Sequence, residues 1–417
     1  MFMHVEFDEL RVTIDRLGAQ GDGIASVDGK DVFVPFALPG EEVEIALDGQ
    51  RAKLESVIAP SPDRVEPVCR HFGSCGGCSV QHLALAHYRA WKRDLITTAF
   101  ASRAIAIKLE PTIEVGLGGR RRVVLTARRD GREIQLGFLQ AGSHVLVDVE
   151  ECPVANDRIV AALPGIRRLL GPIVTSRDDV RVTMLAAENG LDVDVCGGQT
   201  DLSPRVRGEL SKQSAELGLV RLSLEGDPLF LAGEPLVRCG PAEIVPPPGV
   251  FLQASAEAES AMAALAVGGF GKRAKQAADL FCGVGAFTFA LAGRSKVLAM
   301  DNDARAVEAL EDAKRRTQGV KGIETRVRDL FQEPLSRKEL EPFDLVVFDP
   351  PRSGAKAQAE MIAKSKVPAV VAVSCNPATA ARDLRILLDG GYRLERATPI
   401  DQFLYAPHVE VVCVLRR

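Results

Sequence analysis

One cysteine stands in a sequence context that suits catalysis. Cys375 ends an apolar run that begins at Val367, and Asn376-Pro377 follow it, a pattern that predicts a buried strand, a turn and a helix. Open α/β sheets keep their active sites at the carboxyl ends of strands. Most buried cysteines are only small apolar residues, but here the preceding predicted strand ends in Asp349-Pro350-Pro351-Arg352. Cys375 is therefore a candidate nucleophile.

A glycine turn upstream predicts a cofactor site. Residues 277–292, AADLFCGVGAFTFALA, predict a strand, a tight turn at Gly283 and Gly285, and a helix. Asp301 ends the next predicted strand, where an acidic side chain commonly binds ribose hydroxyls. A dinucleotide site would need a third glycine where Thr288 stands, and a P-loop would need a lysine. The turn therefore favours S-adenosylmethionine, which carries no phosphate.

A group of cysteines suggests a metal site. Cys69, Cys75 and Cys78 have the spacing C-x5-C-x2-C, and Cys152, which a proline follows, is a candidate fourth ligand. Thiolates bind zinc or iron–sulfur clusters. A zinc ribbon usually has two C-x2-C pairs, so three clustered cysteines and a distant one favour a 4Fe–4S cluster over zinc. A thioredoxin-like redox pair would require a βαβ context, which this region lacks.

Three domains are expected to position these groups. Residues 1–62 alternate apolar and polar residues between glycines, which predicts a small OB-like β-barrel, with or without a ligand. Residues 63–245 predict a central α+β domain that carries the cysteines, with a helix over 81–103. Residues 246–417 predict an α/β domain. In the central domain, arginines on a predicted hairpin either contact phosphates or form a solvated face: Arg120, Arg121, Arg122, Arg128, Arg129 and Arg132.

Composition limits the class of protein. The net charge is −4 over 417 residues, so any surface that binds nucleic acid must be local. The amino terminus has no signal-peptide core, and no run is long enough for a membrane span. Nine cysteines without a secretory signal predict metal-binding or catalytic thiols in a reducing cytoplasm. We expect a cytoplasmic protein that does not bind membranes.

Several motifs together resemble a known family. SCNPATAARDL, DPPRSG, DLFCGVGAF, FLQAS and HVE, with the cysteine group upstream, are similar to the bacterial RNA uracil-5-methyltransferases over essentially the whole chain. FVPFALPGEEVE and SPDRVEPVC resemble a TRAM domain. The tRNA-specific branch usually lacks this domain and the cysteine group, so the chain is more similar to the ribosomal RNA branch. The resemblance implies a Rossmann-like class I methyltransferase domain behind a TRAM-like barrel.

The resemblance also implies a function and roles for individual residues. By this resemblance the enzyme would form 5-methyluridine in RNA, and 23S ribosomal RNA is the expected substrate. The alternatives are that it forms 5-methyluridine in tRNA or that it binds RNA without catalysis. Cys375 would add to uracil carbon 6 and Glu410 would remove the carbon 5 proton. The cofactor and flipped-base pocket would contain Gln253, Phe281, Gly283, Gly285, Asp301, Asp329 and Asp349. The cluster ligands would be Cys69, Cys75, Cys78 and Cys152.

Some positions depart from the family pattern. Ser255 stands where the family has asparagine, Ala286 follows the second turn glycine, and Leu404, Ala406 and Pro407 interrupt the usual motif before Glu410. A helix after Cys375 would lower the pKa of its thiol through the positive end of the helix dipole. The TRAM-like domain would hold RNA, and the protein is expected to be a monomer.

Overall fold

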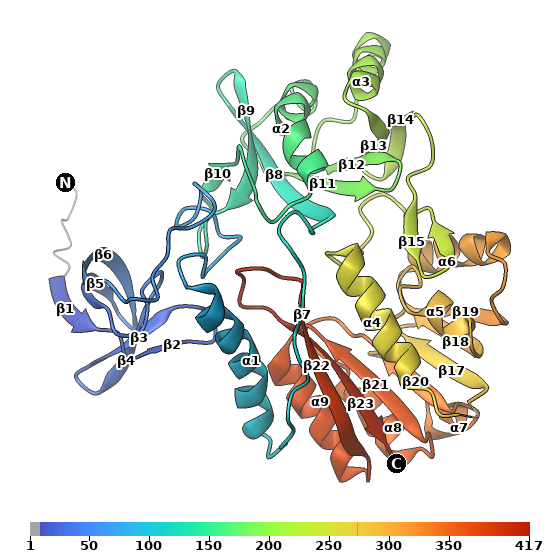
Figure 1. Cartoon of the computed structure of the whole chain (residues 1–417). Helices are drawn as coiled ribbons and strands as arrows, with labels where there is room; N and C mark the ends of the chain where they lie inside the picture. Colours follow the sequence, from blue (N-terminus) through green and yellow to red (C-terminus); the bar gives the residue numbers. More distant parts are fainter. Residues whose placement is uncertain (1–8, 273) are drawn as a thin grey trace. The chain divides into compact units, whose positions relative to one another are not determined.

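The computed structural model describes residues 9–272 and 274–417 (Figure 1). The described chain forms two compact units. Unit 1 contains the residues up to Leu95 with the segments Phe138–Glu151 and Phe403–His408, and unit 2 contains Ile96–Gly137, Cys152–Gln402 and Val409–Arg417. The first eight residues of the barrel predicted over 1–62 lie outside the described range.

Unit 1 contains a six-stranded sheet around its own core, as the alternating pattern predicted. The strand order is β1-β5-β6-β4-β3-β2, and all neighbours are antiparallel except β4 and β6. Apolar side chains from successive strands, such as Ala25, Val34 and Ile45, meet inside. The strands are β1 (Glu9–Thr13), β2 (Arg16–Leu17), β3 (Gly23–Val27), β4 (Lys30–Val34), β5 (Glu42–Asp48) and β6 (Arg51–Ala59).

A buried carboxylate ties this sheet to the segment that follows it. Glu41 is fully buried and accepts hydrogen bonds from the Leu38 and Ser61 backbone N–H groups and from the Arg64 guanidinium. Burial alone would raise the pKa of Glu41, but these donors outweigh it and lower the pKa. The carboxylate therefore stays ionised and fixes the end of the barrel.

The loop 403–408 belongs to unit 1, although strands of unit 2 flank it in the chain. Lys92, on the part of helix α1 (Leu85–Ala101) that lies in unit 1, is 1% exposed and donates from Nζ to the Phe403 and His408 carbonyls. The Tyr405 N–H donates to the Tyr88 hydroxyl at 3.0 Å. The Tyr405 carbonyl accepts from the N–H groups of residues 79 and 80, directly after Cys78. Unit 1 thus holds this loop at both ends and at its centre.

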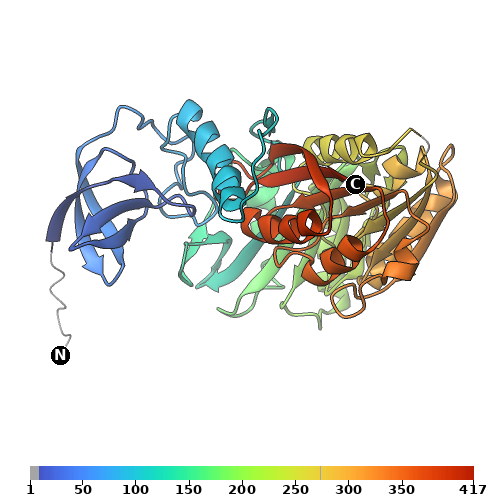
Figure 2. The same ribbon diagram turned by 90° about the horizontal axis from the view of Figure 1, so that it is seen from below.

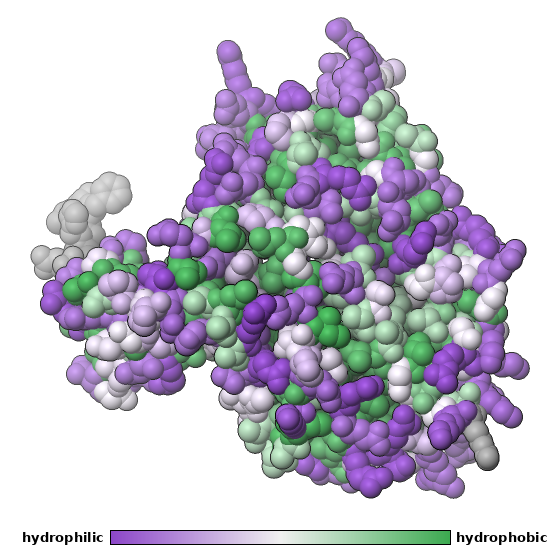
Figure 3. All heavy atoms as spheres, in the orientation of Figure 1, coloured by the Kyte–Doolittle hydropathy of each residue, from purple (hydrophilic) through white to green (hydrophobic). Residues whose placement is uncertain are grey.

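The first sheet of unit 2 is mostly antiparallel. Its strands are ordered β9-β8-β11-β12-β13-β14, and only β12 and β13 are parallel. Helix α3 (Pro204–Glu216) is mainly exposed and hydrophilic, with Leu210 and Ser214 buried (Figure 3). The strands are β8 (Arg122–Asp130), β9 (Glu133–Leu139), β11 (Val180–Ala187), β12 (Gly190–Cys196), β13 (Leu219–Leu224) and β14 (Asp227–Leu231); β10 (Leu146–Asp148) lies in unit 1, and β15 (Val237–Cys239) pairs with β16 (Ala242–Ile244).

The predicted arginine-rich hairpin exists as β8 and β9, but several of its arginines bond other parts of the protein. Arg121 is buried and bonds Glu259 at 2.8 Å. Arg128 pairs with Asp179, and Arg129 donates to two backbone carbonyls. The expectation that these arginines face phosphates or solvent is therefore wrong for the buried Arg121, because sequence spacing does not reveal partners from distant segments.

The second sheet of unit 2 has eight strands in the order β19-β18-β17-β20-β21-β23-β22-β7. The strands from β19 to β21 are parallel, and β23 is antiparallel to both of its neighbours. The order reverses between β17 and β20, which is where such sheets bind ligands. The strands are β7 (Ile113–Glu114), β17 (Gln276–Leu280), β18 (Lys296–Asp301), β19 (Ile323–Val327), β20 (Leu345–Phe348), β21 (Ala369–Ser374), β22 (Arg393–Asp401) and β23 (Glu410–Arg416).

Helices cover both faces of this sheet. Residues of α4, α5 and α6 pack with the sheet in one apolar core, and Figure 2 shows α4 on the side opposite to α8 and α9. Every helix within the described ranges is too short or too polar to cross a lipid bilayer. The helices other than α1 are α2 (Asp157–Leu169), α3 (Pro204–Glu216), α4 (Ala256–Gly268), α5 (Thr288–Ala292), α6 (Ala304–Arg316), α7 (Arg337–Leu340), α8 (Lys356–Lys364) and α9 (Pro377–Asp389).

Candidate active site

Four side chains of unit 2 form a chain of hydrogen bonds. Gln253 donates from Nε2 to Asp349 Oδ2 at 2.9 Å, directly after strand β20. Gln402 donates from Nε2 to Gln253 Oε1 at 2.9 Å and to Glu410 Oε1 at 3.0 Å. The sequence-predicted residues Gln253, Asp349 and Glu410 are thus brought together, and Gln402, which the sequence did not indicate, joins them.

The two carboxyl groups of this chain hold protons more tightly than usual. Burial raises the pKa of Glu410, and the charge of Asp349 raises it further. Burial also raises the pKa of Asp349, which Gln253 opposes by hydrogen bonding. Glu410 is 3% exposed, and its Oε2 has no hydrogen-bond partner among residues 9–272 and 274–417. A carboxylate with a free buried oxygen and a raised pKa has the properties of a general base.

Cys375 follows β21, and a helix follows it as expected. Helix α9 starts at Pro377, and the Asn376 side chain caps it by accepting from the Ala378 N–H. The expected lowering of the thiol pKa is wrong for the ligand-free site. Burial raises the pKa of Cys375 to about 11, with further increases from Glu410 and Asp349, and Arg352 opposes them. Desolvation and two nearby acids therefore outweigh the helix dipole.

The loop after β20 is fastened to the cap of α9. The Arg352 carbonyl accepts from Asn376 Nδ2 at 3.1 Å and from Thr379 Oγ1 at 3.2 Å. The Ala355 N–H donates to the buried Asp383 carboxylate at 2.7 Å. These bonds link the Asp349-Pro350-Pro351-Arg352 segment to the helix that begins after Cys375, so the predicted nucleophile and Asp349 share one rigid support.

The glycine turn after β17 leaves room for a ligand. Gly283 (φ +52°) and Gly285 (φ +101°) have left-handed backbones, and so does Phe281 (φ +63°). A side chain at Gly285 would lie 2.9 Å from the Phe289 ring, so close helix packing requires glycine there. A side chain at Gly283 would meet nothing within 4 Å. The backbone of Gly283 therefore faces open space that a ligand can occupy.

Acidic side chains surround this turn. Asp301 accepts from the Gly283 N–H at 2.8 Å and from the Asp303 N–H at 2.9 Å. Asp279 is fully buried, accepts from Thr288 Oγ1 at 2.6 Å, and has no partner for Oδ1. Burial raises the pKa of Asp279 to about 7. Such an acid-lined turn fits a cationic ligand, and S-adenosylmethionine carries a sulfonium and an ammonium group.

An aromatic pair lies beside the same turn. The rings of Phe281 and Phe331 are 5.3 Å apart, and Phe331 is 41% exposed. Asp329, predicted at the adenine edge, is exposed and accepts from the Phe331 and Gln332 N–H groups. All seven residues predicted for the cofactor and base pocket thus lie in unit 2, on the loops after its strands or before α4.

Sequence reasoning missed two residues of the site besides Phe331. Gln402 occupies a variable position of the motif before Glu410, so only its spacing from Glu410 could have indicated it. Phe251 is 70% exposed and lies two residues before Gln253, and an exposed aromatic ring can stack against a planar ligand. Ser255, a departure from the family asparagine, caps α4 by accepting from the Ala258 N–H, which either residue type does well.

The cysteine group of unit 1 lies on a series of tight turns. Gly76 donates to the Leu139 carbonyl, and a side chain there would lie 2.6 Å from that oxygen. The Gly77 N–H donates to Cys75 Sγ at 3.4 Å. Arg70 binds Glu150 and Glu151, the residues that directly precede Cys152 in the chain. Cys75 and Cys78 line a cavity of about 900 Å³ in unit 1.

The thiols are not gathered into a ligand set. Over residues 9–272 and 274–417, no group of three or more histidine, cysteine, aspartate or glutamate side chains is arranged to hold a metal ion. The donor chemistry of Cys69, Cys75 and Cys78 suits a cluster, but their side chains would have to turn toward a common point.

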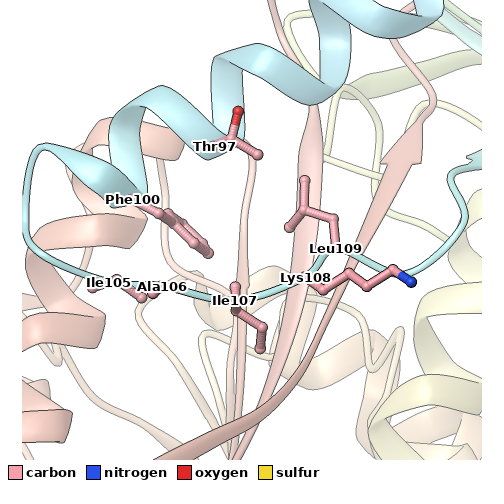
Figure 4. Close-up of a pocket in the computed structure, with 7 residues that line it drawn as sticks. All are labelled: Thr97, Phe100, Ile105, Ala106, Ile107, Lys108 and Leu109. Atoms are coloured by element: carbon pink, nitrogen blue, oxygen red, sulfur yellow. The ribbon is translucent and has the colours of Figure 1, made fainter.

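A separate cavity of about 580 Å³ lies in unit 2 at the end of α1. Figure 4 shows Thr97 and Phe100 on the helix above the extended segment that carries Ile105 to Leu109. Its lining is mainly apolar, and Lys108 is its one titratable residue. This cavity contains none of the predicted site residues.

Comparisons with known proteins agree with this geometry. Residues 247–417 match the family model described as tRNA (uracil-5-)-methyltransferase, and residues 5–51 match the TRAM domain. An uncharacterized RNA methyltransferase of Brucella suis is 44% identical over 98% of both chains. The 23S rRNA (uracil(1939)-C(5))-methyltransferase of Chromohalobacter salexigens is 32% identical, over 97% of this chain and 89% of the relative.

A solved structure shares the fold. The tRNA (uracil-54, C5)-methyltransferase of Pyrococcus abyssi, in complex with S-adenosyl-L-homocysteine, has a TM-score of 0.76 and 22% identity. The match covers 97% of this chain and 99% of that one. At this identity the match demonstrates a common fold.

Proposed function

We propose that this chain, which belongs to the S-adenosylmethionine-dependent RNA (uracil-5-)-methyltransferases, forms 5-methyluridine in 23S ribosomal RNA through a covalent adduct on Cys375. One observation carries the proposal. The Asp349–Gln253–Gln402–Glu410 chain and Cys375 couple a nucleophile to a general base beside an open glycine turn. RNA as substrate is consistent with the TRAM match and the family.

The residues of the site divide the reaction between them. The Cys375 thiolate forms a bond to uracil carbon 6, and the carbon 5–carbon 6 electron pair makes carbon 5 nucleophilic. Bound S-adenosylmethionine supplies the electrophilic methyl group that carbon 5 takes up. The Glu410 carboxylate removes the carbon 5 proton, the carbon 6–sulfur bond breaks, and the thiolate is restored. Gly283, Gly285, Asp301, Phe281 and Asp329 would hold the methyl donor.

The raised pKa values indicate when the site becomes active. A thiol with a pKa of about 11 is mostly protonated at neutral pH, and a protonated thiol is a weak nucleophile. A bound cation stabilises nearby anions and lowers the pKa values of Cys375, Asp349 and Glu410. We infer that the methyl donor activates the thiol as it binds. Phe251 would provide a stacking surface for the extruded base.

The covalent step has a direct test. RNA that contains 5-fluorouridine has no carbon 5 proton to lose, so the adduct with Cys375 should persist in the presence of the methyl donor. We expect Cys375→Ala to abolish both adduct and methyl transfer, whereas Cys196→Ser, at another half-buried cysteine of unit 2, should keep both. Full methylation by Cys375→Ala would overturn the proposal.

The choice of RNA requires a separate test. The 32% identical relative acts on 23S rRNA, whereas the family model and the structural match carry tRNA names. We expect a deletion strain to lose one 5-methyluridine from 23S rRNA and to regain it from wild-type protein but not from Cys375→Ala. Loss from tRNA alone would establish tRNA as the target. The shared family and the connected site speak against a non-catalytic RNA-binding role.

We further propose that Cys69, Cys75, Cys78 and Cys152 bind a 4Fe–4S cluster. Two features support the cluster. Cys69, Cys75 and Cys78 are half-buried thiols within ten residues. The Gly77 N–H donates to Cys75 Sγ, and such N–H groups stabilise thiolate ligands. Protein purified without oxygen should be brown and contain four iron atoms per chain. Colourless protein with one zinc per chain would contradict the cluster. The monomeric state stays a prediction, which sedimentation equilibrium would test.

A further inference from the structure

Gln402 occupies the centre of the buried hydrogen-bond chain. It directly follows β22, is 2% exposed, and contacts both Gln253 Oε1 and Glu410 Oε1 through one nitrogen. Its partner Gln253 is 149 positions away in the sequence. Gln402 therefore joins the loop before α4 to the strand that begins with Glu410.

The network fixes which way each amide points. When Asp349 is ionised, Gln253 must present its nitrogen to it, since an ionised carboxylate only accepts hydrogen bonds. Gln253 Oε1 therefore faces Gln402, which must supply a donor. Both hydrogens of Gln402 Nε2 are then used, one toward Gln253 and one toward Glu410. A reversed Gln402 amide would place its oxygen against two other acceptors.

This arrangement commits one oxygen of Glu410 and frees the other. Oε1 accepts from Gln402, and Oε2 is buried with no partner. A buried acceptor without a donor costs about 1–3 kcal/mol, and here it leaves one oxygen of Glu410 able to take up a proton from a substrate. Gln402 Oε1 is likewise buried without a partner. The chain therefore presents one defined acceptor of Glu410 to the substrate.

We propose that Gln402 is the positioning residue of the proton-abstraction step: it orients Glu410 so that Oε2 receives the carbon 5 proton, and it ties this orientation to the Gln253–Asp349 pair. This inference rests on the proposed methyltransferase function. The residue touches no reacting atom in this scheme and acts through Glu410. Its hydrogen bond also lowers the pKa of Glu410 against the larger effect of burial.

The step at which the reaction stops distinguishes a positioning role of Gln402 from a general loss of structure. If Glu410 is misplaced, Cys375 still adds and carbon 5 still takes the methyl group, but the proton stays and the carbon 6–sulfur bond cannot break. A methylated RNA–protein adduct should then accumulate on natural RNA. Gln402→Met keeps the length of the side chain and removes both donors, so it is the variant of choice.

The experiment measures turnover and denaturant-stable adduct with labelled methyl donor and natural RNA. For Gln402→Met we expect turnover about 10- to 100-fold lower, one methyl transferred per enzyme, and an adduct like that of Glu410→Gln. The acid limb of the pH profile should move to higher pH, because Glu410 loses a donor that favours its ionised form. Gln402→Glu should behave alike, through repulsion of Glu410.

A matched control is available in the same unit. Gln358 is 1% exposed and exchanges two hydrogen bonds with the Leu335 backbone, so Gln358→Met loses equivalent bonds away from the site. Gln358→Met should lower the stability of the protein, but it should accumulate no RNA–protein adduct and should not shift the acid limb of the pH profile. Normal turnover without adduct in folded Gln402→Met, or loss of the single methyl transfer, would overturn the inference. Failure of wild type to form the fluorouridine adduct would instead overturn the proposed function.

Discussion

The site of unit 2 and the cysteine turn of unit 1 are organised in different ways. In unit 2 the functional side chains already bond one another, from Asp349 through two amides to Glu410. In unit 1 the backbone is held tightly, by Gly76 to the Leu139 carbonyl and by Arg70 to Glu151, but no set of metal ligands is formed within the described part of the chain. The protein preorganises the side chains of the site in unit 2. In the cysteine turn of unit 1 it fixes only the backbone, and a ligand would have to bring the side chains together.

This difference predicts that mutations in the two regions will affect activity and stability differently. A preorganised network should lose activity when one member changes, with little effect on folding, because it stores unsatisfied groups for the substrate. A backbone turn without its ligand should show the opposite: packing of the turn matters, and the identity of the thiols matters little.

The largest effect is expected for Glu410→Gln. The amide oxygen can still accept from Gln402, so the network and the fold should persist, but no base remains. We expect turnover to fall about 10²- to 10⁴-fold, while thermal stability at pH 8 stays equal or rises because a buried acid is removed. Glu395→Gln, on the exposed end of β22, should keep full activity. A comparable loss there would show that the effect is not specific.

The second effect concerns pH and the ligand-free protein. The pKa of Asp279 is raised to about 7, and those of Asp349 and Glu410 are also raised by burial. A raised carboxyl pKa stabilises the fold below the unfolded value near 4 and loses that contribution as pH rises through the folded value. Unfolding free energy should therefore fall between about pH 4 and 8, by about 1.4 kcal/mol for each unit by which a folded carboxyl pKa exceeds its unfolded value.

The methyl donor provides the check on this pH effect. If acidic groups face a cationic ligand, its binding should flatten the pH dependence of the melting temperature. Asp279→Asn should flatten it in the ligand-free protein, whereas Asp344→Asn, at an acid that binds only backbone N–H groups, should not. A stability that rises with pH would contradict the raised pKa values.

Much of this site could be predicted from the sequence where local rules apply. The strand, turn and helix around Gly283 and the Asn376-capped helix after Cys375 follow from glycine, proline and capping signals within a few residues. Gln402 could not be predicted, because its role exists only once segments 149 positions apart meet. The raised pKa of Cys375 could not be predicted for the same reason. The helix after Cys375 is close in the sequence, but the acids that raise the pKa come from β23 and the loop after β20.

The third effect concerns the backbone of the cysteine turn at Gly76. Gly76→Ala would place a side chain 2.6 Å from the Leu139 carbonyl and 2.7 Å from the Ala141 nitrogen, so the turn must shift. We expect unfolding free energy to fall by about 1–3 kcal/mol. Gly77→Ala is the matched control, because its side chain would meet only Cys75 Sγ, at an ordinary 3.5 Å. Equal losses for both variants would show that the close approach at Gly76 does not matter.

The smallest effect is expected for a thiol of the turn, and it sharpens the comparison most. In protein freed of metal, Cys75→Ser replaces one half-buried sulfur by an oxygen that can still accept from the Gly77 N–H, so stability should change by less than about 0.5 kcal/mol. In protein purified without oxygen, the same change should remove a ligand and lower stability much more. Equal, small effects in both preparations would mean that the thiols hold no cluster. A large effect without metal would mean that unit 1 is preorganised after all, since the sulfur would then be part of a network as tight as the one around Gln402.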